Sequence, residues 1–355
     1  MSGIKGNELN TISLQKSYSA QKSSGRIVAR VMGCGSYLPD KIVTNDDLAT
    51  SLDTSDEWIF SRTGIRSRHI ASSEQLTSDL AVAALRNSID ASVIASDEID
   101  CIILATTTPD LIMPATAIRV QRLVGATKAA AFDIQAVCSG FLYAMTIADS
   151  MIKSGQAHTV AVIGAEIMSR IVDWNDRRTC VLFGDGAGAM ILQGEEIQDG
   201  EANGWKMPKI SGIEDMEIIS YPELQDALYT SGGIAAGNLN AKMMMDGAKV
   251  FKHAIEKMSS LISKIIAENG YTVDDISWIL PHQANIRILQ AVSERLKLPM
   301  SKFMVTMATH ANTSAASIPL ALDVYVKNGL VQKGQLIVLV TAGAGMTFGV
   351  ALLRW

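Results

Sequence analysis

An internal repeat constrains the fold of this chain more than any other feature of its sequence. Residues 96–105 and 273–282 each begin with an acidic turn and continue into a short apolar run. A helical pattern precedes each copy, at Asp79–Ala91 and at Val250–Asn269. Because a short apolar run bounded by turns is typical of a buried strand, the repeat predicts two halves of the same α/β architecture.

The ends of the two halves match as well. A glycine-rich turn leads into an apolar strand at 183–192 and again at 342–352. A chain of 355 residues is long enough for two such units, at ~100–200 residues for each. We therefore expect an N-terminal half over residues 27–200 and a C-terminal half over residues 201–355.

Two segments do not follow the repeat. Residues 1–26 are rich in Ser, Lys, Gln and Gly, which predicts a polar, disordered leader, with an organelle-targeting segment as the alternative. Residues 194–245 mix Gly, Pro and acidic residues, and we expect a connection whose inserted loops cover a substrate.

The composition excludes several classes of protein. The 31 Lys and Arg residues are outnumbered by 36 Asp and Glu residues, which argues against a general nucleic-acid-binding protein. No apolar stretch of the sequence approaches the ~20 residues that a transmembrane helix needs. The four cysteines form no CxxC pair, so neither a disulfide framework nor a zinc site is expected. Separate thiols are typical of a reducing compartment, and we expect a cytoplasmic protein without a bound metal.

Cys138 is the cysteine best placed for chemistry. Strand character ends near Ala136 and a helical pattern begins at Phe141, so Cys138 lies on a strand-to-helix turn. The free N–H groups and the dipole of a helix N-terminus favour a thiolate and lower the thiol pKa from ~8.5. The residues alone support a reactive thiol and a buried structural cysteine about equally. The remaining cysteines lie in apolar surroundings and are expected to be core residues: Cys34, Cys101 and Cys180.

Two polar residues occupy related positions in the second half. His282 follows an apolar strand pattern, and ligands of α/β sheets bind at strand ends. Asn312 lies 38 residues after Asp274, as Cys138 lies 41 residues after Asp97. Taken singly, they are a satisfied histidine and a helix N-cap. In a duplicated fold, however, equivalent turns face each other, so we expect Cys138, His282 and Asn312 around one cavity.

The glycine loop from Gly343 to Gly345 is expected to bring backbone to the same cavity. Backbone N–H groups, together with Asn and His side chains, stabilise negative charge that develops on an oxygen. The residues therefore indicate a cysteine nucleophile beside an oxyanion-binding site.

At this point the sequence resembles a known family, β-ketoacyl-acyl-carrier-protein synthase III (KAS III). Six of its motifs are similar to segments of this chain, in the right order and over about residues 27–355: 55–66, 136–141, 183–188, 281–285, 312–317 and 343–346. The resemblance implies an α/β, thiolase-like fold. Such a fold has two pseudo-symmetric βαβαβαββ halves in a five-layered αβαβα arrangement, usually in a homodimer.

The resemblance also implies a reaction. Cys138 would take an acyl group from a short acyl-CoA primer, typically acetyl-CoA, and hold it as a thioester. Malonyl-acyl-carrier protein (malonyl-ACP) would then lose carbon dioxide while His282 and Asn312 hydrogen-bond its thioester oxygen. Backbone N–H groups of Cys138, Gly343 and Gly345 would hold the oxyanion. The product is 3-oxoacyl-ACP, which initiates type II fatty-acid synthesis, and acyl-CoA and malonyl-ACP are substrates, so no resident cofactor is implied.

Further site residues are implied by position in the family's motifs. Trp58 and Arg177 would enclose the adenine ring of CoA by stacking and cation–π contact. Met113 and Phe183 would line the primer pocket, Met113 from the partner subunit. Because methionine stands where many members have phenylalanine, a wider primer range than acetyl is expected. The full CoA set is Thr54, Trp58, Arg62, Arg177, Gly247 and Asn285.

The carrier protein is acidic, and a basic patch would receive it. The resemblance assigns this role to Lys252, Arg287 and Arg295. Glu294 stands where a basic residue is frequent, which predicts weaker or shifted docking.

Other functions are compatible with parts of the pattern. A KAS III-like acyltransferase of secondary metabolism keeps the same three residues but uses another primer or extender. A biosynthetic thiolase needs a second cysteine in the C-terminal glycine loop, and none follows Cys180. Papain-like hydrolases also use Cys, His and Asn, but without a duplicated half. A degenerate binding module is disfavoured because Cys138, His282 and Asn312 are all present.

Overall fold

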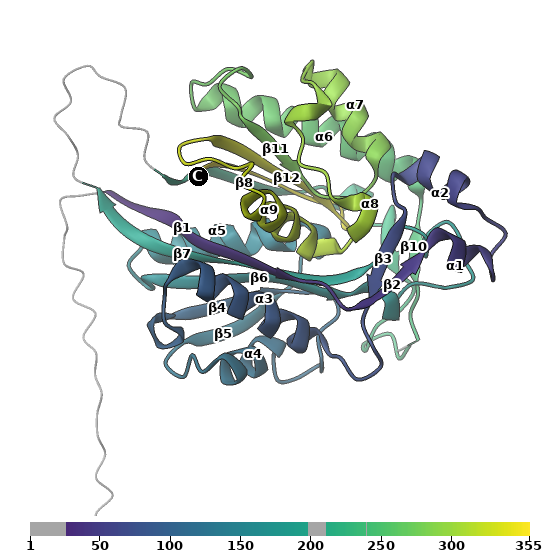
Figure 1. Ribbon diagram of the computed structural model, residues 1–355, viewed down its shortest axis with the longest axis horizontal. Coiled ribbons are helices and arrows are strands. Elements are labelled where there is room, and N and C mark those ends of the chain that lie inside the picture. Colours follow the sequence, from purple (N-terminus) through teal and green to yellow (C-terminus); the bar gives the residue numbers. More distant parts are fainter. Residues whose placement is uncertain (1–25, 198–210, 239) are drawn as a thin grey trace, which may run out of the picture.

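The computed structural model describes residues 26–197, 211–238 and 240–355, and it contains two sheets that pack face to face through helices (Figure 1). The first sheet has the order β1-β7-β6-β4-β5, in which β4 is parallel to β5 and β6, and β7 is antiparallel to β1 and β6. Its strands are β1 (Arg26–Tyr37), β4 (Cys101–Ala105), β5 (Ala130–Ile134), β6 (Thr159–Ile167) and β7 (Asp185–Ile197).

The second sheet repeats this arrangement with the order β8-β13-β12-β11. Its strand β11 is parallel to β12, and β13 is antiparallel to β12 and β8. The strands are β8 (Gly212–Ser220), β11 (Trp278–Pro281), β12 (Leu336–Gly343) and β13 (Thr347–Arg354). The repeated strand order bears out the duplication predicted from the sequence.

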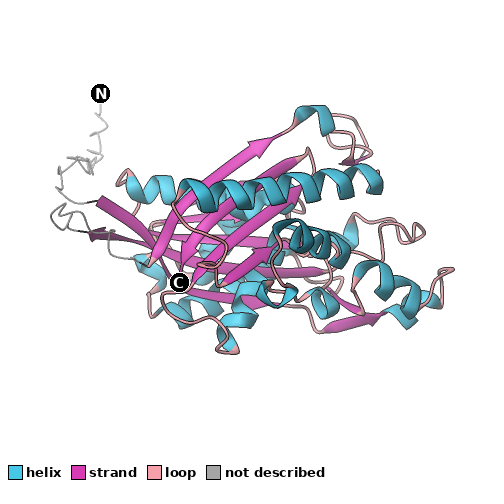
Figure 2. Ribbon diagram, turned by 90° about the horizontal axis from the view of Figure 1, so that it is seen from above, coloured by secondary structure: helices cyan, strands magenta, loops and turns pink. Residues whose placement is uncertain are grey.

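Helices form the remaining three of five layers. Below the first sheet in Figure 1 lie α3 (Thr77–Ser92) and α4 (Thr116–Val124), and between the sheets lie α5 (Gly140–Lys153) and α9 (Ser317–Lys327). Above the second sheet lie α6 (Gly247–Glu268) and α7 (Ile286–Leu296), and α6 crosses its strands when seen from above (Figure 2). No helix within the described ranges has the length and apolarity to cross a membrane.

Short elements complete the chain. An excursion between β1 and α3 carries the first four of them, and they extend to one side of the layers (Figure 1). They are β2 (Lys41–Thr44), α1 (Asn45–Ala49), α2 (Asp56–Thr63) and β3 (Ser67–Ile70), followed later by β9 (Leu228–Thr230), β10 (Met243–Met245) and α8 (Met307–His310).

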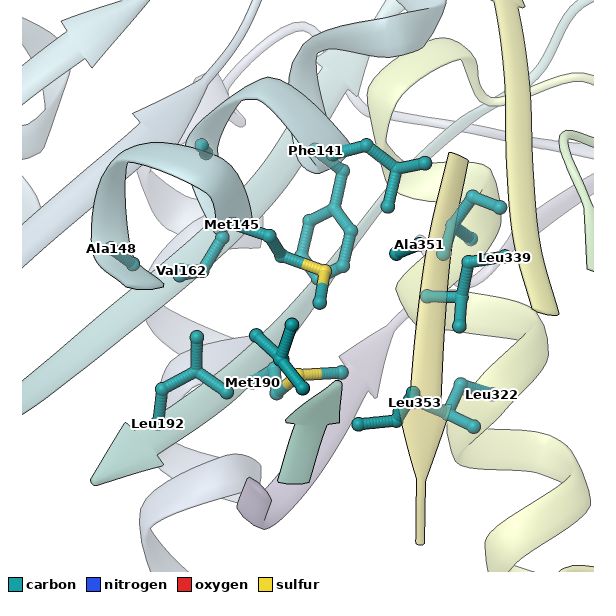
Figure 3. Close-up of a cluster of buried hydrophobic side chains, with 14 of the residues drawn as sticks. Phe141, Met145, Ala148, Val162, Met190, Leu192, Leu322, Leu339, Ala351 and Leu353 are labelled. Carbon is teal, nitrogen blue, oxygen red and sulfur yellow. The ribbon is translucent and has the colours of Figure 1, made fainter. Parts of the chain in front are cut away.

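The layers are held by side chains that alternate along buried strands. In β6 every residue is buried, and successive residues face opposite sides of the sheet. Val162 points into the central cluster with Phe141 of α5 and Leu322 of α9 (Figure 3), whereas Ile163 joins the outer cluster under α3. Burying a side chain of this size contributes about 1.5–3 kcal/mol, so the central layer ties the two halves into one unit.

The two halves differ in one strand. The first half has the predicted βαβαβαββ order, but in the second half the counterpart of β5 is a single bridge between Ile279 and Phe303. Pro281 has no N–H to continue a ladder. The Gln283 side chain instead donates to the Met304 carbonyl at 3.0 Å and accepts from the Thr306 N–H at 2.9 Å. A side chain thus replaces the strand pairing there.

Two predicted boundaries lie at or outside the edges of the residues that the structure describes. The leader assigned to residues 1–26 falls outside them except for Arg26, which begins β1. The boundary between residues 200 and 201 lies in 198–210, also outside.

The prediction of a mere connection over 194–245 is wrong in part. Within it, β8 is an edge strand of the second sheet, pairing with β13. Ile213 of β8 enters the central core while its acidic residues remain half-buried. Charged side chains are frequent on edge strands because they discourage pairing with other chains, and here they obscured the apolar pattern.

Candidate active site

Cys138 lies on a 3-10 turn, Val137–Ser139, between β5 and α5, and its side chain is buried. Val137 has a φ of 49°, which costs a β-branched residue ~1–3 kcal/mol. Contacts with β13 hold the turn: the Ser139 hydroxyl donates to the Thr347 carbonyl at 2.9 Å, and the Thr347 hydroxyl donates to the Ala136 carbonyl at 3.2 Å. The second half of the chain therefore positions the cysteine of the first.

The second half has a turn of the same shape, Ser314–Ala316, immediately before α9. Ser314 has a φ of 50°, matching Val137. Counted from the first residue of each following helix, the counterpart of Cys138 is therefore Ala315, and Asn312 lies three residues earlier than an exact match. The sequence placed Asn312 near the right turn but did not resolve this offset.

The segment from Asn312 to Ser317 connects the three candidate residues. The turn of Ser314 packs against the turn of Cys138, where the Ser314 side chain lowers the thiol pKa, and the Ser314 N–H donates to Asn312 Oδ1 at 2.9 Å. Further along, Ser317 Oγ lies 2.6 Å from His282 Nδ1. Both His282 and Asn312 are buried. The structure thus connects Cys138, His282 and Asn312 through one segment, and that the three surround one cavity stays a prediction.

Gly343 packs directly against the cysteine turn. A Cβ at this position would lie 2.9 Å from the Ser139 nitrogen and 3.0 Å from the Ala136 carbonyl oxygen, so only glycine fits. Gly345 lies in the turn between β12 and β13 with a φ of 121°. The backbone of this loop therefore lies beside Cys138, as expected for the oxyanion site.

A cavity of about 30 Å³ leads from His282 and Gly343 to the layer of α6 and α7. Its remaining wall is mostly apolar, and neither Cys138 nor Asn312 lines it. The other lining residues are Leu228, Val250, Ala254, Met258, Ala284, Ile288, Ala342 and Met346.

Burial dominates the electrostatics of the site. It raises the pKa of Cys138 to about 12, although hydrogen bonds from Ser314 and from the cysteine's own backbone lower it. The expectation of a lowered pKa at this helix N-terminus is therefore wrong. The loss of hydration destabilises the thiolate by more than the nearby dipoles stabilise it. Burial also lowers the pKa of His282 to about 4, so its imidazole is neutral at pH 7.

Glu166, near the end of β6, is a site residue that the sequence reasoning missed. Its side chain is fully buried, and its carboxylate accepts a hydrogen bond from the Ser314 hydroxyl at 3.0 Å. The signal was present, because Glu166 is the only charged residue in the otherwise apolar strand 159–167. A lone acid in a strand buried on both faces needs polar partners.

The residues predicted to enclose the adenine ring lie close together. The Trp58 ring lies 4.6 Å from the Arg62 guanidinium carbon and 5.2 Å from that of Arg177. Arg177 also pairs with Asp53 at 3.0 Å. Thr54 is near this pair in sequence, and its buried hydroxyl has no partner within the described residues.

Gly247 and Asn285 begin the two helices that line the cavity. Gly247 is the first residue of α6, and Asn285 caps α7 by accepting from the Arg287 N–H at 2.8 Å. The positive residues of the predicted carrier patch, Lys252, Arg287 and Arg295, are exposed on the same two helices. Within the described ranges, none of them forms an ion pair.

The two predicted primer-pocket residues lie in different environments. Phe183 is buried, and its backbone lies beside Asn312, with which it pairs through a parallel bridge. Met113 is 80 % exposed, next to the exposed Ile112 and Leu111. Its proposed place in a partner's pocket stays a prediction.

Comparison with known proteins agrees with this arrangement. Residues 132–207 match the family model for 3-oxoacyl-[acyl-carrier-protein (ACP)] synthase III, and residues 266–355 match the model for its C-terminal part. The β-ketoacyl-[acyl-carrier-protein] synthase III of Ehrlichia canis is 51 % identical over 324 residues, which cover 91 % of this chain and 98 % of that protein.

Solved structures share the fold. The 3-oxoacyl-[acyl-carrier-protein] synthase III from Aquifex aeolicus has a TM-score of 0.84 at 41 % identity, over 92 % of this chain and 100 % of that one. The priming β-ketosynthase from the R1128 polyketide pathway has a TM-score of 0.85 at 31 % identity, over 94 % and 98 %. With identity near one half along almost its whole length and the cysteine, histidine and asparagine gathered at one turn, the chain belongs to the β-ketoacyl-[acyl-carrier-protein] synthase III family.

Proposed function

We propose that this chain condenses a short acyl-CoA primer, such as acetyl-CoA, with malonyl-ACP to give 3-oxoacyl-ACP. The observation that carries the proposal is the connection of Cys138, His282 and Asn312 through one buried segment, residues 312–317. The substrates bring the reactive groups with them, so the reaction uses no resident cofactor.

In the first step Cys138 attacks the thioester of the primer. The sulfur bonds to the acyl carbonyl carbon, and CoA leaves. The oxyanion that forms lies between the backbone of the cysteine turn and the glycine loop, and Gly343 permits their close approach. Backbone N–H groups are suited to this role because they need no reorganisation as charge develops.

In the second step the malonyl group loses carbon dioxide, and His282 and Asn312 stabilise the enolate. Asn312 Oδ1 already accepts from the Ser314 N–H, so its amide N–H₂ is the end available to a substrate oxygen. Ser317 Oγ accepts from the Gln283 N–H at 3.4 Å, which favours donation of its own proton to His282 Nδ1. That tautomer leaves an N–H at Nε2. Two neutral donors suit this step because a carboxylate would repel the developing charge.

The test is intact-mass spectrometry of the full chain after incubation with separate acetyl-, butyryl- and branched acyl-CoA. We expect a covalent gain of one acyl group, and loss of that group with formation of 3-oxoacyl-ACP when malonyl-ACP is added. Acylation by more than acetyl-CoA would support the wider pocket expected from Met113. An acyl-enzyme that forms but does not condense with malonyl-ACP would identify the alternative, an acyltransferase with another extender. Absence of any acyl-enzyme would overturn the proposal.

We also propose that the exposed basic residues of α6 and α7 dock the carrier protein. The proposal is supported by their position, because these two helices line the cavity that reaches His282. Lys252, Arg287 and Arg295 are free to attract an acidic partner, since no ion pair occupies them within the described ranges. Glu294, exposed beside Arg295, reduces the local positive charge.

Charge reversal tests this docking surface. Arg287→Glu is expected to raise the KM for malonyl-ACP about tenfold, with little change in acylation by acetyl-CoA, because only the carrier uses this surface. Steady-state kinetics at two salt concentrations measures the effect, which salt should weaken. Arg122→Glu is the matched control, since Arg122 is exposed on α4 in the opposite outer layer. Equal KM changes in both variants would rule out a specific docking surface.

The assembly and the compartment complete the proposal. A homodimer is supported by the exposed apolar run Leu111, Ile112 and Met113, at 60 %, 68 % and 80 % exposure, because such a run is costly to leave in water. A reducing cytoplasm is supported by the four cysteines, all of them unpaired.

A further inference from the structure

Glu166 is a buried carboxyl group to which the two steps above give no role. It continues the row of β6 residues, with Val160 and Val162, that faces the central layer. Burying a carboxylate is costly unless hydrogen bonds replace its water. The partners of its two oxygens therefore indicate what the group does.

The two oxygens of Glu166 have different surroundings. Oε2 accepts from the Thr107 N–H at 3.0 Å, from the Thr108 hydroxyl at 2.9 Å and from the Thr106 hydroxyl at 3.4 Å. Oε1 accepts from the Ser314 hydroxyl at 3.0 Å. Because donors already surround Oε2, a proton that reaches this carboxylate binds at Oε1, the oxygen that contacts Ser314.

Ser314 connects this oxygen to the nucleophile. The Ser314–Ala316 turn packs against the Val137–Ser139 turn, and both the Ser314 side chain and the charge of Glu166 act on the pKa of the Cys138 thiol. A hydroxyl donates one hydrogen bond and accepts others. Two arrangements are therefore available with the same net charge: a thiol with an ionised Glu166, or a thiolate with a protonated Glu166. In the second, Glu166 donates to Ser314, and Ser314 donates to the sulfur.

The scaffold itself does not require an acid at this position. Ala105 pairs with Gly164 in the first half, and Pro281 pairs with Val340 in the second. Two residues further along each strand, Glu166 in β6 corresponds to Ala342 in β12. The second half completes the same turn with alanine there. Only the half that carries Cys138 has the carboxylate.

Few other ionisable groups of the described chain face Glu166. The segment after β4 approaches it with threonines, and the 314–316 turn approaches it with a serine. The Val137–Ser139 turn contributes the thiol of Cys138. Asp185 of β7 pairs with Ile167, so it projects to the outer face, where it accepts from Ser169. The Asp323 carboxylate of α9 accepts hydrogen bonds from Ser36 and Lys327, not from the groups around Glu166.

We propose that Glu166, acting through the Ser314 hydroxyl, takes up the proton of Cys138 when its sulfur attacks the primer. The inference rests on the proposed function, because it requires Cys138 as the nucleophile. As the bond between Sγ and the acyl carbon forms, the thiol proton passes to Ser314 Oγ and the Ser314 proton passes to Glu166 Oε1. The carbon–sulfur bond to CoA breaks, and CoA leaves as a thiolate that takes a proton from water.

Condensation reverses this transfer. The carbanion formed by decarboxylation bonds to the acyl carbon, and Cys138 leaves as a thiolate. Glu166 then returns its proton through Ser314 to the sulfur, which restores the starting state. Glu166 is a positioning residue in this scheme, since it touches neither substrate.

The acid strength of Glu166 suits a group that works in both directions. Burial raises its pKa to about 7, although its hydrogen bonds lower it. A proton acceptor is most useful when its pKa lies near the working pH. His282 is a poorer acceptor, because burial lowers its pKa to about 4.

The test is the pH dependence of Cys138 alkylation by iodoacetamide, followed by intact-mass spectrometry of the full chain. In the wild type the rate is expected to rise with a midpoint near pH 7, as Glu166 ionises. In Glu166→Gln this rise is expected to disappear, and the alkylation rate at pH 8 should fall about tenfold or more. Ser314→Ala should lose it too, and the double variant should be no slower than either single one, because all act on one pathway. Glu166→Asp, which keeps a carboxylate, should restore part of the rise.

Three results would overturn the inference. The first is a wild-type alkylation rate that shows no midpoint near pH 7. The second is a pH profile of alkylation that is unchanged in Glu166→Gln. The third is a Glu166→Gln variant that is alkylated more slowly but keeps the midpoint, which would indicate a merely structural role. If Glu166→Gln folds poorly, the alkylation profile of Ser314→Ala tests the same pathway. Alkylation needs neither acyl-CoA nor malonyl-ACP. A failure of the proposed function would instead appear as normal alkylation without any acyl-enzyme.

Discussion

Replacing Cys138 by serine is expected to abolish the acyl-enzyme and to lower condensation by on the order of 10³-fold or more, since the step through the sulfur is lost. A serine hydroxyl in this buried turn is a far weaker nucleophile than a thiol, and the site lacks a base strong enough to ionise it. His282 does not serve, because burial lowers its pKa to about 4. Intact-mass spectrometry after incubation with acetyl-CoA measures the acyl-enzyme, and product formation measures condensation.

Cys101→Ala is the matched control for this change. Cys101 is also buried in the central core, but it is the first residue of β4, whereas the candidate site lies beyond the last residue, Ala105. The control should acquire one acyl group at Cys138, with some loss of thermal stability from the missing sulfur. Acylation of the Cys138→Ser variant at another cysteine, with condensation retained, would contradict the assignment of the nucleophile.

Replacing Asn312 by aspartate is expected to separate the two steps. A carboxylate keeps the acceptor for the Ser314 N–H at 2.9 Å, so the turn should hold its shape. It removes the donor to the substrate oxygen and adds negative charge where the enolate forms. Losing one such donor costs ~10²–10³-fold in rate, and the added charge increases the loss.

The acyl-enzyme is the internal control for Asn312→Asp. Transfer from acetyl-CoA should proceed, measured by mass, while decarboxylation of malonyl-ACP should fall, measured as carbon dioxide release. The pH of the assay matters little for His282, because its low pKa keeps it neutral above about pH 4. Wild-type decarboxylation by this variant would show that Asn312 does not contact the enolate.

The local pattern of the sequence was enough to predict the architecture. Apolar runs and glycine turns repeat in both halves, and these signals depend only on neighbouring residues. The helix predicted over Val250–Asn269 corresponds to α6, Gly247–Glu268. The strand end at His282 and the turn at Cys138 were predicted in the same way, because Pro and Gly end helices and strands through local backbone effects.

Features set by pairing across the chain were not predictable in this way. The edge strand β8 was missed because its acidic residues hide the alternation. In the second half, the counterpart of β5 is only a bridge at Phe303. The side chain of Gln283 hydrogen-bonds the neighbouring backbone carbonyl and N–H groups, which a full strand would otherwise pair. Neither can be inferred from a segment considered alone.

The sequence by itself determined the duplicated α/β fold and the cysteine, histidine and asparagine that the two halves contribute. The tertiary structure decided how those residues are ionised and what surrounds them. Burial raises the pKa of Cys138, against the prediction from its helix terminus, and it places Glu166 beside Ser314. The physical reason is that desolvation depends on every layer packed around a group, whereas the turn that presents it depends on a few residues in sequence.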